Sequence, residues 1–141
     1  MFKTKQFNKS FISVDLALFF SRITLGLLIF INHGIEKIFT FNSMLAIFPD
    51  PIGIGKFPSL FFALLTDGIC SILIIFGLFT RISTLLLSIN LFVAFVLFHK
   101  LQITDVHGEL VVIYLVITIL VFILGPGNIS IDKLLKNKFS E

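Results

Sequence analysis

Four apolar windows constrain this chain more than any other feature. They cover Leu16–Ile31, Leu60–Phe79, Ile82–Phe98 and Leu110–Leu124. A helix needs about 20 residues to cross roughly 30 Å of hydrocarbon, and each window reaches that length with its flanking residues. Helices are expected here because lipid offers no partner to backbone N–H and C=O groups. The sequence therefore predicts an all-α membrane protein, a bundle of four transmembrane helices.

The composition supports a membrane setting. The chain is 57% hydrophobic and 13% charged, whereas a soluble domain carries about 25% charged residues. With 141 residues it has too little interior to hide that much apolar side chain from water. The first window could also be a cleaved signal, but no small-residue cleavage pattern follows Ile31. We expect one transmembrane domain over residues 1–141, with helices at about 15–39, 59–79, 82–99 and 109–125.

Lysine and arginine predict the orientation. If both termini are cytoplasmic, the outer side holds only Lys37, Lys56 and Lys100. The inner side then holds Lys3, Lys5, Lys9, Arg81, Lys133, Lys136 and Lys138. This positive-inside bias predicts an N-in, C-in protein of a bacterial inner (plasma) membrane. The net charge of +3 reflects this topology and anionic headgroups, so the lipid bilayer is the expected partner and nucleic acid is not.

The C-terminal segment predicts a short interfacial helix. Gly125-Pro126-Gly127 should end the fourth helix, because proline cannot continue it and glycine permits the turn. Ser130 or Asp132 can then cap a short helix. Its apolar and basic side chains, suited to a membrane surface, are Ile131, Leu134 and Leu135 and Lys133, Lys136 and Lys138.

Familiar catalytic motifs are absent from the sequence. The stretch Gly53–Ser59 lacks the spacing of a phosphate loop, and neither GxGxxG nor HExxH occurs. A single cysteine, Cys70, excludes an internal disulfide relay and is expected to be a packed thiol. Electron transfer by this chain would therefore need a bound cofactor, a quinone or a partner.

Ionisable residues within the apolar windows are the informative exceptions. Each costs about 2.5–3.5 kcal/mol at the bilayer centre on insertion scales. On the first helix, a step of about 100° per residue puts Asp15, Arg22, Gly26 and His33 on one face. Glu36 and Lys37 flank that face, so we expect a polar stripe turned into the bundle.

Axial distances predict a polar site in the outer third of the membrane. At about 1.5 Å per residue, His33 lies roughly 25 Å above the inner boundary, and His99 reaches a similar level. Glu109 opens the fourth helix at that level, while Asp67 lies roughly 10 Å below the outer end of the second helix. These four residues are the candidate catalytic set.

A structural explanation of the same residues stays open. His33, His99 and Glu109 lie near predicted helix ends, where polar residues are common. Arg22 can snorkel towards headgroups or Asp15, and Asp105 and His107 suit loop polarity. The histidine spacing is unspecific, so no metal is expected.

The third helix also suggests association. Ser88 and His99 share one face, while Ser83, Asn90 and Ala94 share another. If His99 faces the bundle, the Asn90 face would meet a second copy, because small and polar residues promote helix contact in lipid. This predicts a homo-oligomer.

Several segments, in this order, resemble the DoxX family from about Leu16 to Leu135. They are "SRITLGLLIFINHGIEK" (Ser21–Lys37), "FPDPIGIG" (Phe48–Gly55), "CSILIIFGLFTR" (Cys70–Arg81), His99, Gly108-Glu109 and "GPGNISID" (Gly125–Asp132). The resemblance implies a small four-helix membrane protein. The family name is tied to a subunit of a thiosulfate:quinone oxidoreductase, and other members are linked to membrane oxidoreductase assemblies.

The resemblance also suggests site residues. Arg22, His33, Gly34, Lys37, Arg81 and His99 fall on recurrent polar positions of the family. Asp67 departs from the pattern, because relatives commonly carry glutamate there. The charge is kept, and the reach is shorter by one methylene group.

These observations together predict a quinone-linked redox subunit with a membrane or soluble redox partner. His33 or His99 would hydrogen-bond a quinone carbonyl, and Asp67 and Glu109 would handle protons. Arg22, Arg81 and both histidines would bind the cofactor or stabilise its charge. Two alternatives are a non-enzymatic scaffold that recruits soluble redox proteins and a small transporter or ion pathway.

The orientation can be tested by single-cysteine labelling in a variant that lacks Cys70. Cysteines at Lys56 and Lys100 should react with an impermeant reagent added outside, because both positions lie in predicted outer loops. A cysteine at Arg81 should react only after the membrane is opened. Protection of positions 56 and 100 from the outside reagent would overturn the predicted orientation.

Overall fold

The computed structural model describes residues 3–139, with side chains from Val14 onward, and every regular element within that range is a helix. Among these residues, four helices are long and apolar enough to cross a membrane. They are Val14–Phe39, Lys56–Phe76, Thr80–Phe98 and Val106–Leu124. The predicted all-α bundle of four membrane helices is confirmed.

Three of the four spans contain a π-helical turn. In chain order the elements are α1 (Lys3–Ile29), η1 (Phe30–Gly34), α2 (Ile35–Phe39), α3 (Phe41–Ile47), α4 (Lys56–Leu64), η2 (Leu65–Cys70), α5 (Ser71–Phe76), α6 (Thr80–Val93), η3 (Ala94–Phe98), α7 (Val106–Leu124) and α8 (Ile131–Lys138), where η marks a π-helix. π-Helical turns are rare in proteins, and those that occur often lie at functional sites. Two of them, η1 and η2, carry the candidate residues His33 and Asp67.

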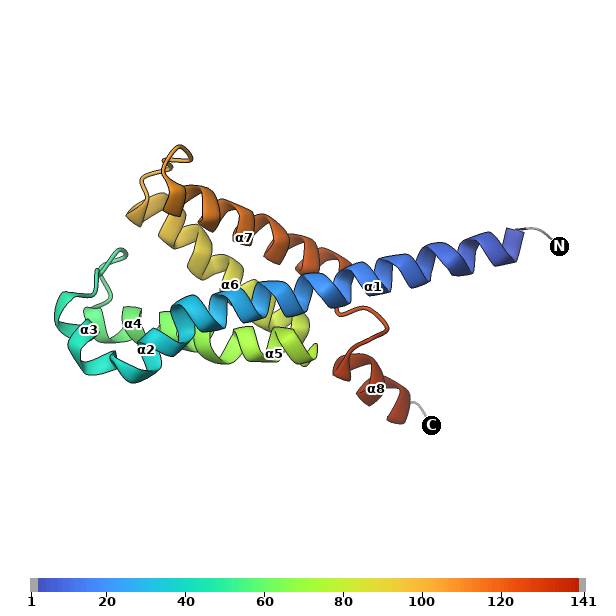
Figure 1. Cartoon of the computed structure of the whole chain (residues 1–141). Coiled ribbons are helices and arrows are strands. Elements are labelled where there is room, and N and C mark those ends of the chain that lie inside the picture. The colour runs from blue at the N-terminus through green and yellow to red at the C-terminus, as the bar shows by residue number, and fades with distance from the viewer. Residues whose placement is uncertain (1–2, 140–141) are drawn as a thin grey trace.

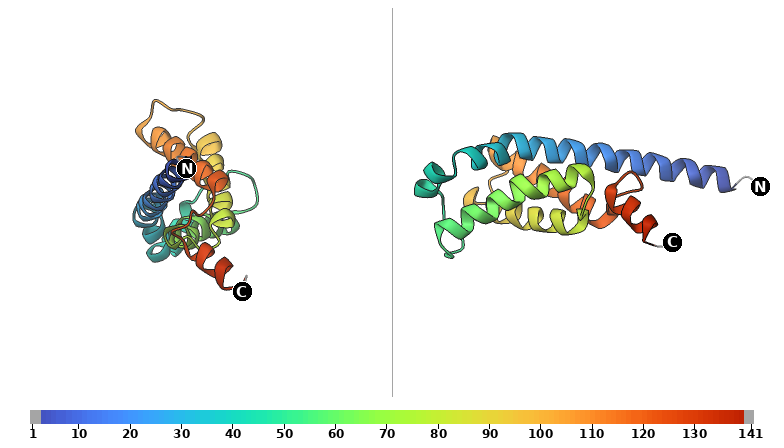
Figure 2. Two further views of the ribbon diagram at one scale, coloured as in Figure 1. Left: turned by 90° about the vertical axis from the view of Figure 1, so that its right-hand side faces the viewer. Right: turned by 90° about the horizontal axis from the view of Figure 1, so that it is seen from below.

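Successive spans run in opposite directions and lie side by side as a bundle (Figure 1). α5 packs along α1 and η2 packs on η1, while α6 and α7 form a hairpin on the other side of the bundle (Figure 2). The N-terminal part of α1 projects beyond the bundle, and α8 hangs from the same end (Figure 1). Both described ends of the chain therefore lie on one side, as an even number of spans requires.

Glycines end the second and fourth spans on the side where both described chain ends lie, which is the predicted cytoplasmic, or inner, side. Gly77 has φ 67° and ends α5, where its N–H donates to Ile74 O at 3.1 Å and the N–H of Leu78 donates to Leu73 O at 2.9 Å. The second span thus stops at Phe76 rather than near residue 79. Gly125 has φ 83° and ends α7 in the same way. Only glycine adopts these angles without steric cost.

The interior of the bundle is built from small and hydroxylated side chains beside an aliphatic core. The core cluster comprises Leu25, Ile29, Ile74, Leu87, Leu91 and Tyr114. The buried hydroxyl side chains are Ser59, Thr66, Ser71, Thr80, Ser83, Thr84, Thr118 and Ser130. Large apolar residues face outward, with Phe20 59% and Phe92 57% exposed. Lipid accepts that outer surface, while small residues let the helices approach closely.

α1 and α5 are in close contact at Gly26. A Cβ atom on Gly26 would lie 2.7 Å from the carbonyl oxygen of Ser71 and 2.5 Å from Cγ1 of Ile75. The carbonyl belongs to the α5 backbone and cannot rotate away. A side chain at position 26 would therefore push the two helices apart.

Gly26→Ala should lower the free energy of unfolding by about 1–3 kcal/mol, as overpacking does in a packed core. Gly68→Ala is the matched control, because its Cβ would meet only Leu64 Cδ1 at 3.6 Å and Ile38 Cδ1 at 4.0 Å. That control should stay within about 1 kcal/mol of the parent. Equal melting temperatures for both variants in one detergent would contradict the close approach.

Candidate functional site

The segment "NHGIEK" is shaped by the π-turn η1 and a buried glycine. A Cβ on Gly34 would lie 2.5 Å from the carbonyl oxygen of Asp67, so only glycine lets η1 pack directly on η2. The wide turn of η1 also rotates the following residues relative to an ideal α-helix. As a result Gly34 and Lys37 face the bundle, while His33 and Glu36 are exposed. The predicted polar stripe faces the bundle at Arg22 and Gly26. The prediction that His33 also faces the bundle was wrong, because the π-turn η1 changes the helical rotation there.

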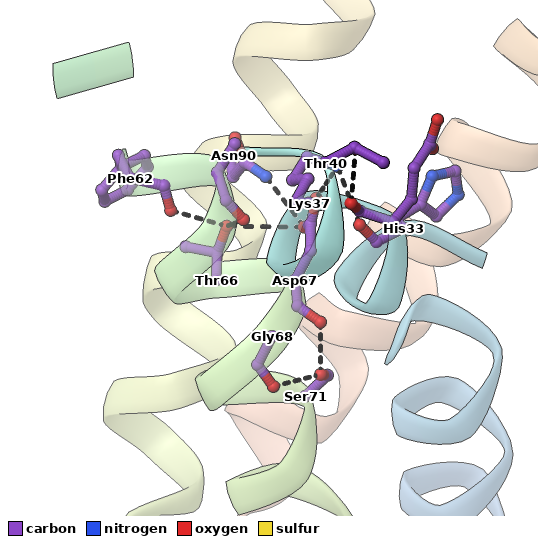
Figure 3. Close-up of polar contacts among 11 residues, drawn as sticks. His33, Lys37, Thr40, Phe62, Thr66, Asp67, Gly68, Ser71 and Asn90 are labelled. Atoms are coloured by element: carbon purple, nitrogen blue, oxygen red, sulfur yellow. Dashed lines mark hydrogen bonds and ion pairs between the residues drawn. The ribbon is translucent and has the colours of Figure 1, made fainter. Parts of the chain in front are cut away.

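A buried ion pair joins the first and second spans. Lys37 Nζ lies 2.9 Å from Asp67 Oδ2, and the two side chains are 10% and 9% exposed. The same ammonium donates to the carbonyl oxygen of His33 at 3.2 Å (Figure 3). Lys37 therefore reaches inward from the outer end of its span to meet Asp67.

The other oxygen of the carboxylate faces the third span. Asn90 Nδ2 donates to Asp67 Oδ1 at 3.0 Å, and the Thr66 hydroxyl approaches the same oxygen at 3.4 Å. Asp67 is thus held by groups from three spans (Figure 3). We call Lys37, Asp67 and Asn90 the carboxylate cluster.

The carboxylate cluster lies deep in the membrane. Asp67 is ten residues before Gly77, which corresponds to about 15 Å along the helix. That is about half of a hydrocarbon core of roughly 30 Å. A charge at this depth is stable only with a partner. The contacts of Asp67 with Lys37 and Asn90 offset part of the cost of burying the carboxylate.

His33 contributes its backbone rather than its side chain. Its imidazole is exposed and points away from Asp67 (Figure 3). In a bilayer this exposed ring faces lipid or headgroups beside the carboxylate cluster. It is therefore accessible to a ligand that approaches from the membrane.

His99 belongs to a separate group at the outer tip of the α6–α7 hairpin. Nδ1 of His99 and Nδ1 of His107 lie 4.0 Å and 3.9 Å from Asp105 Oδ2. His99 is nine residues beyond Asn90, or about 13 Å along the helix. The side chain of Glu109 is exposed, without a hydrogen bond or ion pair among residues 14–139. The structure thus brings neither His99 nor Glu109 into contact with Asp67.

Arg22 and Arg81 lie at the opposite end of the bundle. Arg22 is 1% exposed and donates to the carbonyl oxygen of Ile129, and Arg81 is exposed beside Gly125. Along the first span, Arg22 is about 22 Å from Lys37. Neither arginine can therefore contact a small headgroup bound at the carboxylate cluster. Snorkelling of Arg22 to Asp15 is also not observed, because the Asp15 carboxylate binds Asn128.

Asn90 is the residue that the sequence analysis assigned to the wrong surface. Its amide binds Asp67, and Ser83 on the same face is 1% exposed, so this face lies inside the bundle. The face proposed to meet a second copy is thus an intramolecular contact. The pairing of Lys37 with Asp67 was also missed, although a lysine inside a membrane span is itself a signal of a buried partner.

Among the residues that the structure describes, no three His, Cys, Asp or Glu side chains are placed to hold a metal ion. Cys70 is a buried free thiol. The chemistry that the cluster offers is therefore hydrogen bonding and proton exchange by a carboxylate and an ammonium group.

Comparison with known proteins gives one result. A family model described as DoxX matches residues 17–100, a range that contains the whole carboxylate cluster and ends before α7. No curated protein and no solved structure matches the chain significantly.

A double-mutant cycle tests the ion pair. Lys37→Gln or Asp67→Asn alone leaves a buried charge without its partner and should cost about 3 kcal/mol of unfolding free energy. The double variant removes both charges, so it should regain most of that loss. Glu36→Gln, at an exposed neighbouring position, should change little. Additive losses in the double variant, measured by thermal unfolding, would show that the pair is not coupled.

Proposed function

This chain is a multi-pass membrane protein of the DoxX family, and from that premise we propose that it is a quinone-linked subunit of a membrane oxidoreductase system. It would work in a bacterial inner membrane, with a membrane or soluble redox partner as the electron donor. Cys70 is the only thiol of the chain, so electrons must come from outside it.

The carboxylate cluster is the observation that supports this proposal. A charged pair at mid-membrane depth adds little net stability compared with an apolar replacement, so its presence favours a functional role. Reduction of a quinone consumes two electrons and two protons. Asp67 and Lys37 are groups that can exchange protons at the depth where a lipid-soluble substrate resides.

The residues suit distinct tasks. The Lys37 ammonium can donate a hydrogen bond to a carbonyl oxygen and stabilise negative charge that develops there. The Asp67 carboxylate can hold a proton and return it, and Asn90 fixes its orientation through Oδ1. The exposed imidazole of His33 can contact a headgroup from the lipid side.

An apolar trough on the lipid-facing surface supports a long-tailed substrate. Two adjoining hollows of about 280 and 290 Å³ follow the seam between α1 and α7 and share Ser21 and Ile117. Leu28 lines the trough, and it is five residues, or about 8 Å, from His33. An isoprenoid tail could lie along this seam with its headgroup near His33.

Quinone binding to purified protein is the direct test. The double variant Lys37→Gln/Asp67→Asn should stay folded and bind quinone at least about tenfold more weakly, because it loses a charge-assisted hydrogen bond. His33→Gln should weaken binding less. Glu36→Gln serves as the exposed control, and quinone reduction with the native partner present is the second measurement.

The opposite outcome has a clear meaning. If the folded double variant and His33→Gln bind and reduce quinone like the parent, the carboxylate cluster is a structural element. Co-purification of soluble redox proteins with such a fully active variant would favour the scaffold function instead.

A further inference from the structure

Arg22 is a buried cation whose hydrogen-bonding groups are only partly used. Its side chain is 1% exposed, and Nη2 donates to the carbonyl oxygen of Ile129. Nε and Nη1 are buried without any hydrogen-bond partner. Among the described side chains, no carboxylate forms an ion pair with Arg22.

The two acidic side chains near Arg22, Asp132 and Asp15, already accept hydrogen bonds from other groups. Asp132 attracts Arg22 electrostatically, but its two oxygens accept the N–H groups of Phe79 at 2.8 Å and Thr80 at 2.9 Å. Asp15 accepts the backbone N–H of Asn128 at 2.8 Å and its amide at 2.6 Å. Arg22 therefore differs from Lys37, whose charge has a carboxylate in direct contact.

An arginine cannot remove this problem by losing its proton, because the guanidinium group stays protonated in proteins. A buried charge without a paired anion is costly, and buried N–H groups without acceptors add to that cost. The most direct compensation is an anion that accepts from Nε and Nη1.

The position of Arg22 indicates which anions can reach it. It lies against Gly77, where a Cβ atom would overlap Nη1, so the guanidinium is level with the inner ends of the spans. The buried hydroxyl of Thr80, adjacent to the same turn, also has no hydrogen-bond partner. Arg81 is exposed nearby, beside Gly125. This is the level of the inner interface, where phosphate groups of lipids are abundant.

We propose that the inner end of the bundle binds a phosphate-bearing anion, with Arg22 as its principal ligand and Thr80 as a further donor. The phosphate can belong to an anionic lipid headgroup or be free in solution. Guanidinium groups favour phosphate because several N–H donors lie in one plane around a delocalised charge.

The segment Gly125–Ser130 controls access to this site. It covers the guanidinium through Ile129, and polar contacts between Asp15 and Asn128 hold it in place. Phosphate oxygens and the Ile129 carbonyl compete for the same guanidinium. Binding therefore displaces that carbonyl, and the segment shifts to admit the anion.

Thermal unfolding in a neutral detergent tests the proposal. Sodium phosphate, compared with sodium chloride at equal ionic strength, should raise the melting temperature of the parent by about 3 °C at saturation. A second arm compares phosphatidylglycerol with diacylglycerol, which has similar tails and no phosphate, and native mass spectrometry counts the retained lipid. A response only to phosphatidylglycerol identifies a lipid headgroup, and a response only to sodium phosphate identifies free phosphate.

Two variants and one control make the result specific. Arg22→Gln should abolish the response, while Arg81→Gln, an exposed cation at the same end, should respond like the parent. Thr80→Val keeps the charge and nearly the same shape, so it should bind several-fold more weakly even if Arg22→Gln fails to fold. A parent that responds in neither arm, or an Arg22→Gln or Thr80→Val variant that responds fully, overturns the proposal.

Discussion

The contact of Gly34 with the backbone of Asp67 is the constraint on which the outer half of the bundle depends. Without a side chain at Gly34, η1 packs on η2 closely enough for Lys37 to reach the Asp67 carboxylate. The π-turns place these groups, because each one rotates the helix that follows it. Asn90 then ties the third span to the same carboxylate. One close backbone contact thus determines the depth, pairing and orientation of the charged groups.

The two buried cations of the first span, Lys37 and Arg22, differ in their hydrogen-bond partners. Lys37 has an anionic partner, Asp67, and a carbonyl acceptor on His33 within the chain. Arg22 retains unpartnered donors beneath a segment held by polar contacts. The outer end is therefore suited to proton exchange, and the inner end is suited to anion binding.

The bundle was predictable from sequence because lipid permits few alternatives. Long apolar windows, Gly125 and the cap residue Ser130 each act through local rules, and Ser130 caps α8 as expected. The stop at Gly77 was missed, because the second helix was predicted to run to about residue 79. The site was predictable only in part. Asp67 was identified from its apolar surroundings, but its pairing depends on the rotation introduced by η1, which a fixed step of about 100° per residue does not represent. The exposure of His33 has the same cause. Asn90 lies in the regular helix α6, and its face was assigned wrongly because His99, beyond η3, was assumed to face the bundle.

The aspartate at position 67 is consistent with this close packing. A glutamate at this position would reach one methylene further from the helix. Here Lys37 supplies the length instead, because its flexible chain spans the distance from α2 to the carboxylate, and both side chains remain about nine-tenths buried. The short side chain of Asp67 keeps its carboxylate oxygens close to η2. There Thr66 and Asn90 can fix the position and the orientation of the carboxylate. The lysine is thus the longer partner of the pair, and a ligand that drew its ammonium away would leave the Asp67 carboxylate with Asn90 and Thr66 as its side-chain partners.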